Sequence, residues 1–343
     1  MLPERPSPKR RRARMDSAPT LADVGRAAGV STATVSRAIA RPELVSGETR
    51  DEVIKAVHAL GYMPNAAARA LSRRRSGLVG LVAGSMDDEV VVRAIGSFAQ
   101  QLADAGCGLL LAAGNGSAED ARAQAGDLIA CGADALAFVG VEFPSDVAGP
   151  GHAWRRPLAS IDQPAWGTGF TGFSRAEALQ LAVRYLRQLG HRRIGLVAGG
   201  PGCAVSVVST LVASEGVDLI ELANTMEEGG RIASGTGGPL QWLSRPIPPT
   251  AVVCGSDAVA AGILRECEAR EIAVPGRLSV IGFGDTEIAR QTRPGLSTLR
   301  LPVREAALAA ASYLIGALRG EAVPGHALHA KLVARDSTRP PSS

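Results

Sequence analysis

The segment GVSTATVSRAI, residues 29–39, places four hydroxyl side chains and one arginine directly after a glycine. Hydroxyl groups suit DNA phosphates, methyl groups suit thymine, and an arginine can donate two hydrogen bonds to atoms O6 and N7 of guanine. A helix that only lined a hydrophobic core would not need these groups. The residues predicted to contact DNA are Ser31, Thr32, Ala33, Thr34, Ser36 and Arg37.

Short helices must hold this segment away from its own core. Thr20 and Asp23 have the spacing of a capping box, which predicts a first helix ending at Gly29. Ser31 can then cap a second helix. The inward residues of that helix are Val35 and Ile39. Two short helices around a glycine turn form a helix-turn-helix, whose second helix fits a major groove.

A third helix is predicted to close the core of this head. It begins behind Ser46 and stops at Gly61. The residues expected on its inward stripe are Val53, Ile54, Val57 and Leu60.

The charge of the chain is unevenly distributed. Up to Arg75 there are 15 basic and 7 acidic residues, whereas the rest has 22 basic and 26 acidic residues. A basic head on a mildly acidic body indicates that the head meets phosphates. The run PKRRRAR, residues 8–14, is equally compatible with a tail that only improves solubility.

The segment NAAARALSRRR, residues 65–75, joins the head to the rest of the chain. Its helix-forming part is about two turns long, so it needs a partner to be stable. Leu71 stands among arginines, a setting that suits an apolar wedge in a minor groove. A flexible linker is the alternative interpretation.

Beyond residue 76, apolar runs alternate with helical segments. The runs expected as strands are residues 77–84, 108–115, 135–141, 157–162, 192–200, 250–257 and 278–285. Helical patterns between them, as in residues 91–106 and 174–190, predict parallel sheets covered by helices. The number of strands favours two similar doubly wound lobes. The fold class is therefore a small all-α head and hinge helix followed by two α/β lobes.

Polar residues follow several of these strands, where open α/β sheets bind their ligands. They are Ser85, Asp87, Asn115, Asp162, Ser256, Asp257 and Asp285. Such groups suit a hydroxylated small molecule. The glycines of residues 195–202 lack the rest of a dinucleotide-binding motif, and the five histidines form no ligand cluster. We therefore expect no cofactor and no metal site.

The composition excludes several classes of protein. The chain is 46% hydrophobic and 20% charged, which is typical of a globular protein. It has no apolar run of roughly 18 residues and no apolar stretch typical of a signal peptide. Its five cysteines lack C-x-x-C spacing and are expected to be buried thiols of a cytoplasmic protein without membrane contact. The sequence contains no recognisable pairing of a nucleophile with a base, so we expect a protein that is not an enzyme.

The sequences TLADVGRAAGVSTATVSRAI and VSGETRDEVIKAVHALGYMPNAAARAL resemble the lactose/galactose repressor (LacI-type) family of bacterial transcription regulators. The resemblance implies base contacts from Thr32, Ala33 and Arg37, with Ser31, Thr34 and Ser36 near the DNA backbone. It also implies a hinge helix that pairs with a second subunit and inserts a leucine into the minor groove. The family's hinge positions fall on Asn65, Ala68 and Leu71.

Downstream, LRQLGHRRIGLVAGG, PPTAVVCGSDAVAAGIL, VPGRLSVIGFGDTEIA and RPGLSTLRLP resemble the effector domain of the same family, which is similar to periplasmic sugar-binding proteins. The implied organisation is a tail (1–18), a helix-turn-helix domain (19–64), a hinge helix (65–76), an N-lobe (77–172 and 301–322) and a C-lobe (173–300 and 323–338). The implied effector-binding residues are Ser85, Asp87, Asp162, Phe173, Ser256, Asp257 and Gly284.

Two positions depart from the family pattern. Gly284 stands where members that bind neutral sugars have an aspartate, which favours an acidic ligand. Ala204 aligns with a family arginine, and losing that residue acts in the opposite direction. The motifs IGFGD and TGFSRAEA are similar to the gluconate-utilisation branch, so a gluconate-like effector is the hypothesis.

The resemblance predicts a regulator, chiefly a repressor of a carbohydrate or sugar-acid operon, that binds a pseudo-palindromic operator as a homodimer or tetramer. Whether the effector releases DNA or strengthens binding stays open. An activator and a cytoplasmic sugar-binding protein without a DNA role are the alternatives.

Overall fold

The computed structural model describes residues 19–63, 75–144, 156–163, 170–197, 216–222, 226–227, 231–232, 240–323 and 328–341. The chain divides into two compact units, residues 1–76 and 77–343. Each unit has its own hydrophobic core. None of the helices in the described ranges has the length and apolar character that a membrane crossing requires.

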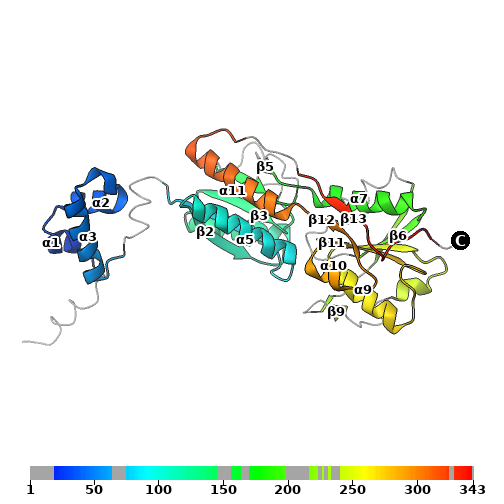
Figure 1. Cartoon of the computed structure of the whole chain (residues 1–343). Coiled ribbons are helices and arrows are strands. Elements are labelled where there is room, and N and C mark those ends of the chain that lie inside the picture. Colours follow the sequence, from blue (N-terminus) through cyan, green and yellow to red (C-terminus); the bar gives the residue numbers. More distant parts are fainter. Residues whose placement is uncertain are drawn as a thin grey trace, which may run out of the picture. The chain divides into compact units, whose positions relative to one another are not determined.

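The first unit contains a head of short helices. They are α1 (Leu21–Ala27), α2 (Thr32–Ala40), the 3-10 helix η3 (Pro42–Leu44) and α3 (Gly47–Leu60) (Figure 1). The predicted capping box is present, because Thr20 and Asp23 bond reciprocally at the start of α1. Gly29 and Gly61 have φ of +66° and +61°, values that favour glycine, at the two turns where helices end. The local signals therefore position the helices as expected.

A small apolar cluster joins the three helices of the head. Its buried members are Val24, Val35, Ala38, Val53, Ala56 and Tyr62. The predicted inward stripe of α3 is wrong at two positions, because the side chains of Ile54 and Leu60 are 44% and 37% exposed. Ala56 and Tyr62 instead complete the core, which is too small to cover a wider face of α3.

The N-lobe of the second unit is built on a parallel sheet with strand order β2-β1-β3-β4-β5. Its strands are β1 (Leu78–Ala83), β2 (Gly108–Ala113), β3 (Ala135–Val139), β4 (Leu158–Ser160) and β5 (Phe170–Thr171). Its helices are α5 (Glu89–Asp104), α6 (Ala118–Ala130) and α11 (Val303–Arg319), of which α5 and α11 lie side by side (Figure 1). The β1 side chains Val79 and Leu81 join the α5 cluster, whereas Val82 joins the α6 cluster. Burial on both faces explains the continuous apolar runs.

The C-lobe has a six-stranded sheet with order β13-β12-β11-β10-β6-β7. Its strands are β6 (Arg193–Val197), β7 (Asp218–Leu222), β10 (Ala251–Cys254), β11 (Ser279–Phe283), β12 (Ser297–Arg300) and β13 (Lys331–Val333). Its helices are α7 (Arg175–Gln188), α9 (Asp257–Ala269), α10 (Glu287–Gln291) and the 3-10 helix η6 (Gln241–Ser244). A small hairpin pairs β8 (Met226–Glu227) with β9 (Arg231–Ile232).

The chain passes between the lobes three times, between β5 and α7, between β12 and α11, and between α11 and β13. The expectation of purely parallel sheets needs one correction at the edge of the C-lobe, where β13 pairs with β12 in the antiparallel direction. This happens because β13 returns from the other lobe and not through a crossover helix of its own. The expectation of buried cysteines is confirmed for Cys254 and Cys267. It is wrong for Cys131, which is exposed, and for Cys107, which is half-buried, and Cys203 lies outside the described residues.

Candidate nucleic-acid interface and ligand site

The start of α2 presents the residues predicted to contact DNA. Ser31 is its N-cap, and the Ser31 Oγ accepts a hydrogen bond from the Thr34 backbone N–H at 3.1 Å. The hydroxyls of Ser31 and Thr34 also lie 2.9 Å apart, so part of their capacity is used within the helix. Thr32, Ala33, Ser36 and Arg37 are exposed, and Thr34 is half-buried. Five of the six predicted residues are thus exposed at the start of α2, and the contacts of all six with DNA stay a prediction.

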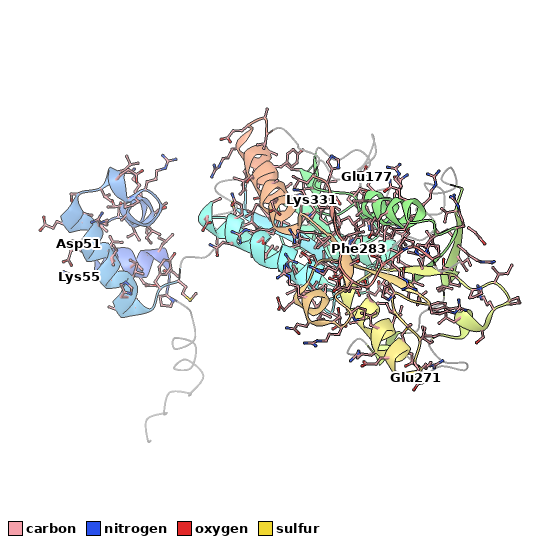
Figure 2. The ribbon with its side chains drawn as sticks, turned by 45° about the vertical axis from the view of Figure 1, so that its right-hand side comes forward. Asp51, Lys55, Glu177, Glu271, Phe283 and Lys331 are labelled. Atoms are coloured by element: carbon pink, nitrogen blue, oxygen red, sulfur yellow. The ribbon has the colours of Figure 1, made fainter. Side chains whose placement is uncertain are left out.

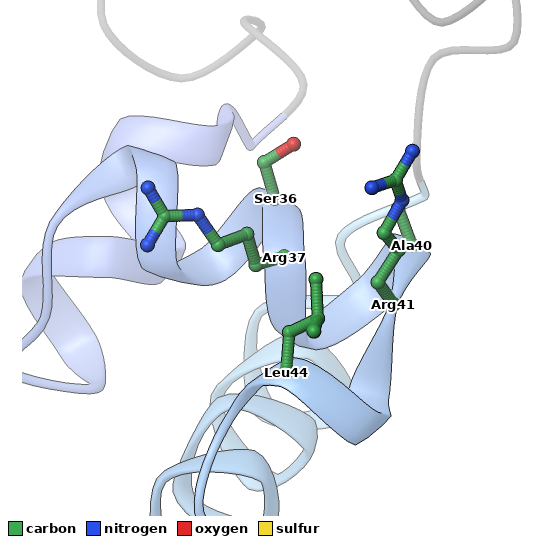
Figure 3. Close-up of a pocket in the computed structure, with 5 residues that line it drawn as sticks. All are labelled: Ser36, Arg37, Ala40, Arg41 and Leu44. Carbon is green, nitrogen blue, oxygen red and sulfur yellow. The ribbon is translucent and has the colours of Figure 1, made fainter.

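A shallow depression of about 250 Å³ lies beside this face. It is lined by Ser36, Arg37, Ala40, Arg41 and Leu44 (Figure 3). The guanidinium groups of Arg37 and Arg41 extend on opposite sides of Leu44, whose side chain is 57% exposed. Ala40, Arg41 and Leu44 were not among the residues predicted from the sequence to contact DNA. The sequence offered one signal for an apolar contact, which is Leu44 in the short segment PEL that begins with a proline.

The charges of the head are arranged differently on α2 than on the other helices. Arg26 pairs with Asp23 on α1 at 3.0 Å, and Lys55 pairs with Glu52 on α3 at 2.8 Å. Within the described head, no acidic side chain pairs with Arg37 or Arg41. These two arginines therefore keep their donors available for phosphates or base edges.

The predicted hinge residues Asn65, Ala68 and Leu71 lie outside the described residues. Their paired arrangement and the minor-groove wedge stay a prediction.

In the N-lobe, Asp162 follows β4 and is buried, with 1% of its surface exposed. Both of its carboxylate oxygens accept hydrogen bonds from the Gly140 backbone N–H, at 3.0 and 3.1 Å. Arg175, the first residue of α7, donates from Nε to the Asp162 Oδ2 at 2.6 Å and from Nη2 to the Asp88 Oδ2 at 3.1 Å. The structure thus joins the predicted residue Asp162 to two residues that were not predicted, Arg175 and Asp88.

The other predicted residues of the N-lobe side occupy different surroundings. Phe173 is 2% exposed and belongs to the main hydrophobic core. Ser85 and Asp87 form a turn after β1, in which the Asp87 backbone N–H donates to the Ser85 Oγ at 3.1 Å. Asn115, which also follows a strand, uses its side-chain oxygen to cap the turn at Ser117 at 2.8 Å. Within the described residues, no hydrogen bond links Phe173, Ser85, Asp87 or Asn115 to Asp162.

In the C-lobe, Ser256 caps α9 and Asp257 is its first residue. The Asp257 carboxylate is buried and accepts hydrogen bonds from the Thr286 N–H at 2.7 Å and the Thr298 hydroxyl at 2.6 Å. A β-carbon placed on Gly284 would lie 3.4 Å from the Asp257 Oδ2 and 3.7 Å from Val90 of α5. Gly284 and Asp257 are therefore neighbours at the boundary with the N-lobe.

Burial sets the electrostatics of both carboxylates. It raises the pKa of Asp162, and the charge of Arg175 opposes this shift. It also raises the pKa of Asp257, against hydrogen bonds from Thr298 and Thr286 that lower it. Since internal donors already occupy both groups, their direct role in binding an effector stays a prediction.

Gly284→Asp should destabilise the second unit. The φ of Gly284 is +131°, where a side chain is strained, and the new carboxylate would adjoin that of Asp257. We expect the free energy of unfolding to fall by about 1–3 kcal/mol, measured by denaturant unfolding. Gly284→Ala tests the backbone strain without the charge. A Gly284→Asp protein as stable as the wild type would contradict this description of the turn.

Within the described residues, no group of three or more histidine, cysteine, aspartate or glutamate side chains is arranged to hold a metal ion. The polar groups near the boundary between the lobes include carboxylates, hydroxyls, backbone amides and the guanidinium groups of Arg175 and Arg300. These groups are suited to hydrogen bonding with a polar small molecule.

Comparison with known proteins relates both units to one family. Residues 20–65 match the family model described as bacterial regulatory proteins, lacI family, and residues 183–338 match a periplasmic binding protein-like domain. The HTH-type transcriptional regulator AscG of Escherichia coli (strain K12) is 32% identical over 348 residues, covering 94% of this chain and 99% of AscG. The HTH-type transcriptional repressor PurR of Shigella sonnei (strain Ss046) is 30% identical over 296 residues, covering 82% of this chain and 85% of PurR.

Solved structures show the same fold. The structure of the lac repressor dimer bound to operator and the anti-inducer ONPF aligns with a TM-score of 0.75 at 23% identity, covering 94% of this chain and all of that one. A lacI family regulator from Silicibacter pomeroyi aligns with a TM-score of 0.76, also at 23% identity, covering 94% of this chain and 99% of that one.

Proposed function

Because the chain belongs to the lacI family of bacterial regulatory proteins and is a DNA-binding transcriptional regulator, we propose that it represses an operon for carbohydrate or sugar-acid utilisation. The observation that carries the DNA-binding part is the exposed start of α2, with Arg37 and Arg41 left unpaired among the described acidic groups. We further propose that the protein is not an enzyme and works in the cytoplasm, because it acts on DNA and not on a bound substrate.

The proposed complex is a two-fold dimer on a pseudo-palindromic operator. Two copies of α2 enter successive major grooves, which lie about 34–36 Å apart on one face of the duplex. The segment with Asn65, Ala68 and Leu71 pairs with its copy and places the leucine in the minor groove between them. Whether two dimers associate further is a separate question, because nothing in this arrangement requires a tetramer.

The proposed effector is a sugar acid that resembles gluconate and binds between the two lobes. Two observations support an anionic ligand over a neutral sugar. Gly284 supplies no carboxylate where its relatives that bind neutral sugars are expected to have one, and Arg175 places a guanidinium near the boundary of the lobes. Ser85, Asp87, Asp162, Phe173, Ser256 and Asp257 are the further proposed positions of this site.

Two measurements test the proposed function. Nuclease protection of genomic DNA upstream of carbohydrate operons should reveal a protected pseudo-palindrome, whose protection changes when gluconate or 6-phosphogluconate is added. Calorimetric titration of the purified protein with gluconate, 6-phosphogluconate and glucose should show binding of the acids. Binding of glucose alone would contradict the sugar-acid effector, and the absence of any preferred duplex would contradict the regulator itself.

A further inference from the structure

Arg175 stands at the point where the chain enters the C-lobe, yet its partners lie in the N-lobe. It is the first residue of α7, and its side chain is only 7% exposed. Asp162 follows β4, and Asp88 caps α5, so both carboxylates belong to the N-lobe. On its other side, the guanidinium carbon lies 5.9 Å from the centre of the Phe283 ring at the end of β11 (Figure 2 labels Phe283). Arg175 therefore touches structural elements of both lobes.

The charges and donors of this cluster are not balanced. One guanidinium faces two carboxylates, which leaves one negative charge in excess. Arg175 uses Nε for Asp162 and Nη2 for Asp88. Among the described residues, none accepts a hydrogen bond from Nη1. A buried guanidinium with an unused nitrogen retains the capacity to bind an anion.

The two carboxylates hold Arg175 to different degrees. Asp162 lies 2.6 Å from Nε, is 1% exposed and is fixed by the Gly140 N–H. Asp88 lies 3.1 Å from Nη2, is 24% exposed and has a second function, because its Oδ1 accepts the Val90 N–H at 2.8 Å as the cap of α5. Asp88 can therefore return to solvent and keep its capping bond, whereas Asp162 cannot leave Arg175 without losing buried contacts.

We propose that Arg175 binds the anionic group of the effector, a carboxylate or a phosphate ester, through Nη1 and Nη2 in exchange for Asp88. This inference rests on the proposed effector site and assigns its anion-binding residue. Asp162 keeps Nε and fixes the plane of the guanidinium, so the two terminal nitrogens form the fork that matches a planar carboxylate or two phosphate oxygens. Asp88 occupies that fork in the absence of ligand and competes with the effector.

Asp88→Asn tests the exchange without removing Arg175. Asparagine keeps an oxygen for the cap of α5 but carries no charge, so the competition for the guanidinium becomes weaker. Calorimetry on the full chain should show that gluconate, 6-phosphogluconate or inorganic phosphate binds the variant about tenfold more tightly than it binds the wild type. The affinity for glucose should not increase. A gain for gluconate alone identifies a carboxylate, and a gain for the two phosphate compounds alone identifies a phosphate group.

Glu89→Gln is the matched control, because it removes one negative charge from the next residue, which is exposed on α5. It should leave the three anion affinities within about twofold of wild type. Arg175→Lys keeps a positive charge but lacks the two terminal nitrogens that form the fork. If Asp88→Asn strengthens anion binding, Arg175→Lys should weaken anion binding about tenfold.

Two results would overturn the proposal. One is that Asp88→Asn and the wild type bind all three anions equally, which makes the cluster only a link between lobes. The other is that Glu89→Gln gives the same gain, which makes the effect one of overall charge. If Asp88→Asn strengthens phosphate binding but no sugar acid alters operator protection by the wild type, the anion site stands and the proposed sugar-acid effector fails.

Discussion

Arg175→Met is expected to lower the free energy of unfolding of the second unit by about 3–5 kcal/mol. Methionine fills a similar length but leaves Asp162 buried without its cation and Asp88 without its partner. Burial already raises the pKa of Asp162, so without Arg175 the carboxylate would ionise at a still larger cost. Denaturant unfolding followed by circular dichroism measures this loss.

Two further variants separate charge from packing in that experiment. Arg265→Met replaces an exposed arginine of α9 and should change stability by no more than about 0.5 kcal/mol. The double variant Arg175→Met with Asp88→Asn should recover part of the loss, since it removes one of the two uncompensated charges. If Arg175→Met were as stable as Arg265→Met, the buried cluster would not hold the lobes as described.

Arg37→Ala is expected to abolish most of the preference for the operator over random DNA. A bidentate arginine contact with guanine contributes about 1–3 kcal/mol of discrimination, or roughly 5- to 150-fold in relative affinity. The operator is first obtained by selection from random duplexes, and both affinities are then measured by fluorescence anisotropy at one fixed salt concentration. The affinity for the selected duplex should fall much further than the affinity for random DNA.

Arg41→Ala is the matched control for Arg37. Both residues line the depression on the head and both lack an acidic partner in the described head. Arg41 follows the last turn of α2, farther from the N-terminal residues that meet base edges, and we expect it to contact phosphate. Its loss should lower the affinity for both duplexes by the same factor and make this affinity less dependent on salt concentration. Equal losses on both duplexes for Arg37→Ala would show that Arg37 does not contact bases.

The cluster at Arg175 suggests how ligand and DNA binding communicate. An anion that displaces Asp88 changes how α7, on the C-lobe side, is attached to the first turn of α5 in the N-lobe. The lobe arrangement that tolerates this exchange gains population, with a coupling free energy typically of about 1–3 kcal/mol. Either sign of coupling is compatible with this geometry, so a ligand could release the operator or strengthen its binding.

Local signals in the sequence determined most of the head. The Thr20 capping box, the Ser31 and Ser46 caps and the turn glycines each act within a few residues, so they could be identified without a structure. The exposure of Ile54 and Leu60 could not be predicted, because it depends on which face of α3 the other two helices cover.

In the body, the apolar runs of the sequence determined β1, β2, β3, β4, β6, β10 and β11 and the polar residues at their ends, whereas the short strands β5, β7, β12 and β13 were not predicted. Only the tertiary structure decided what those residues contact. Asp162 meets Arg175, which is 13 positions away along the chain, and Arg175 in turn meets Asp88 from a different strand end. Asp257 meets Thr298, 41 positions away, because only β11 separates β10 from β12 in the sheet. Periodicity and capping are local properties of a chain, whereas the partner of a buried charge depends on how distant segments come together.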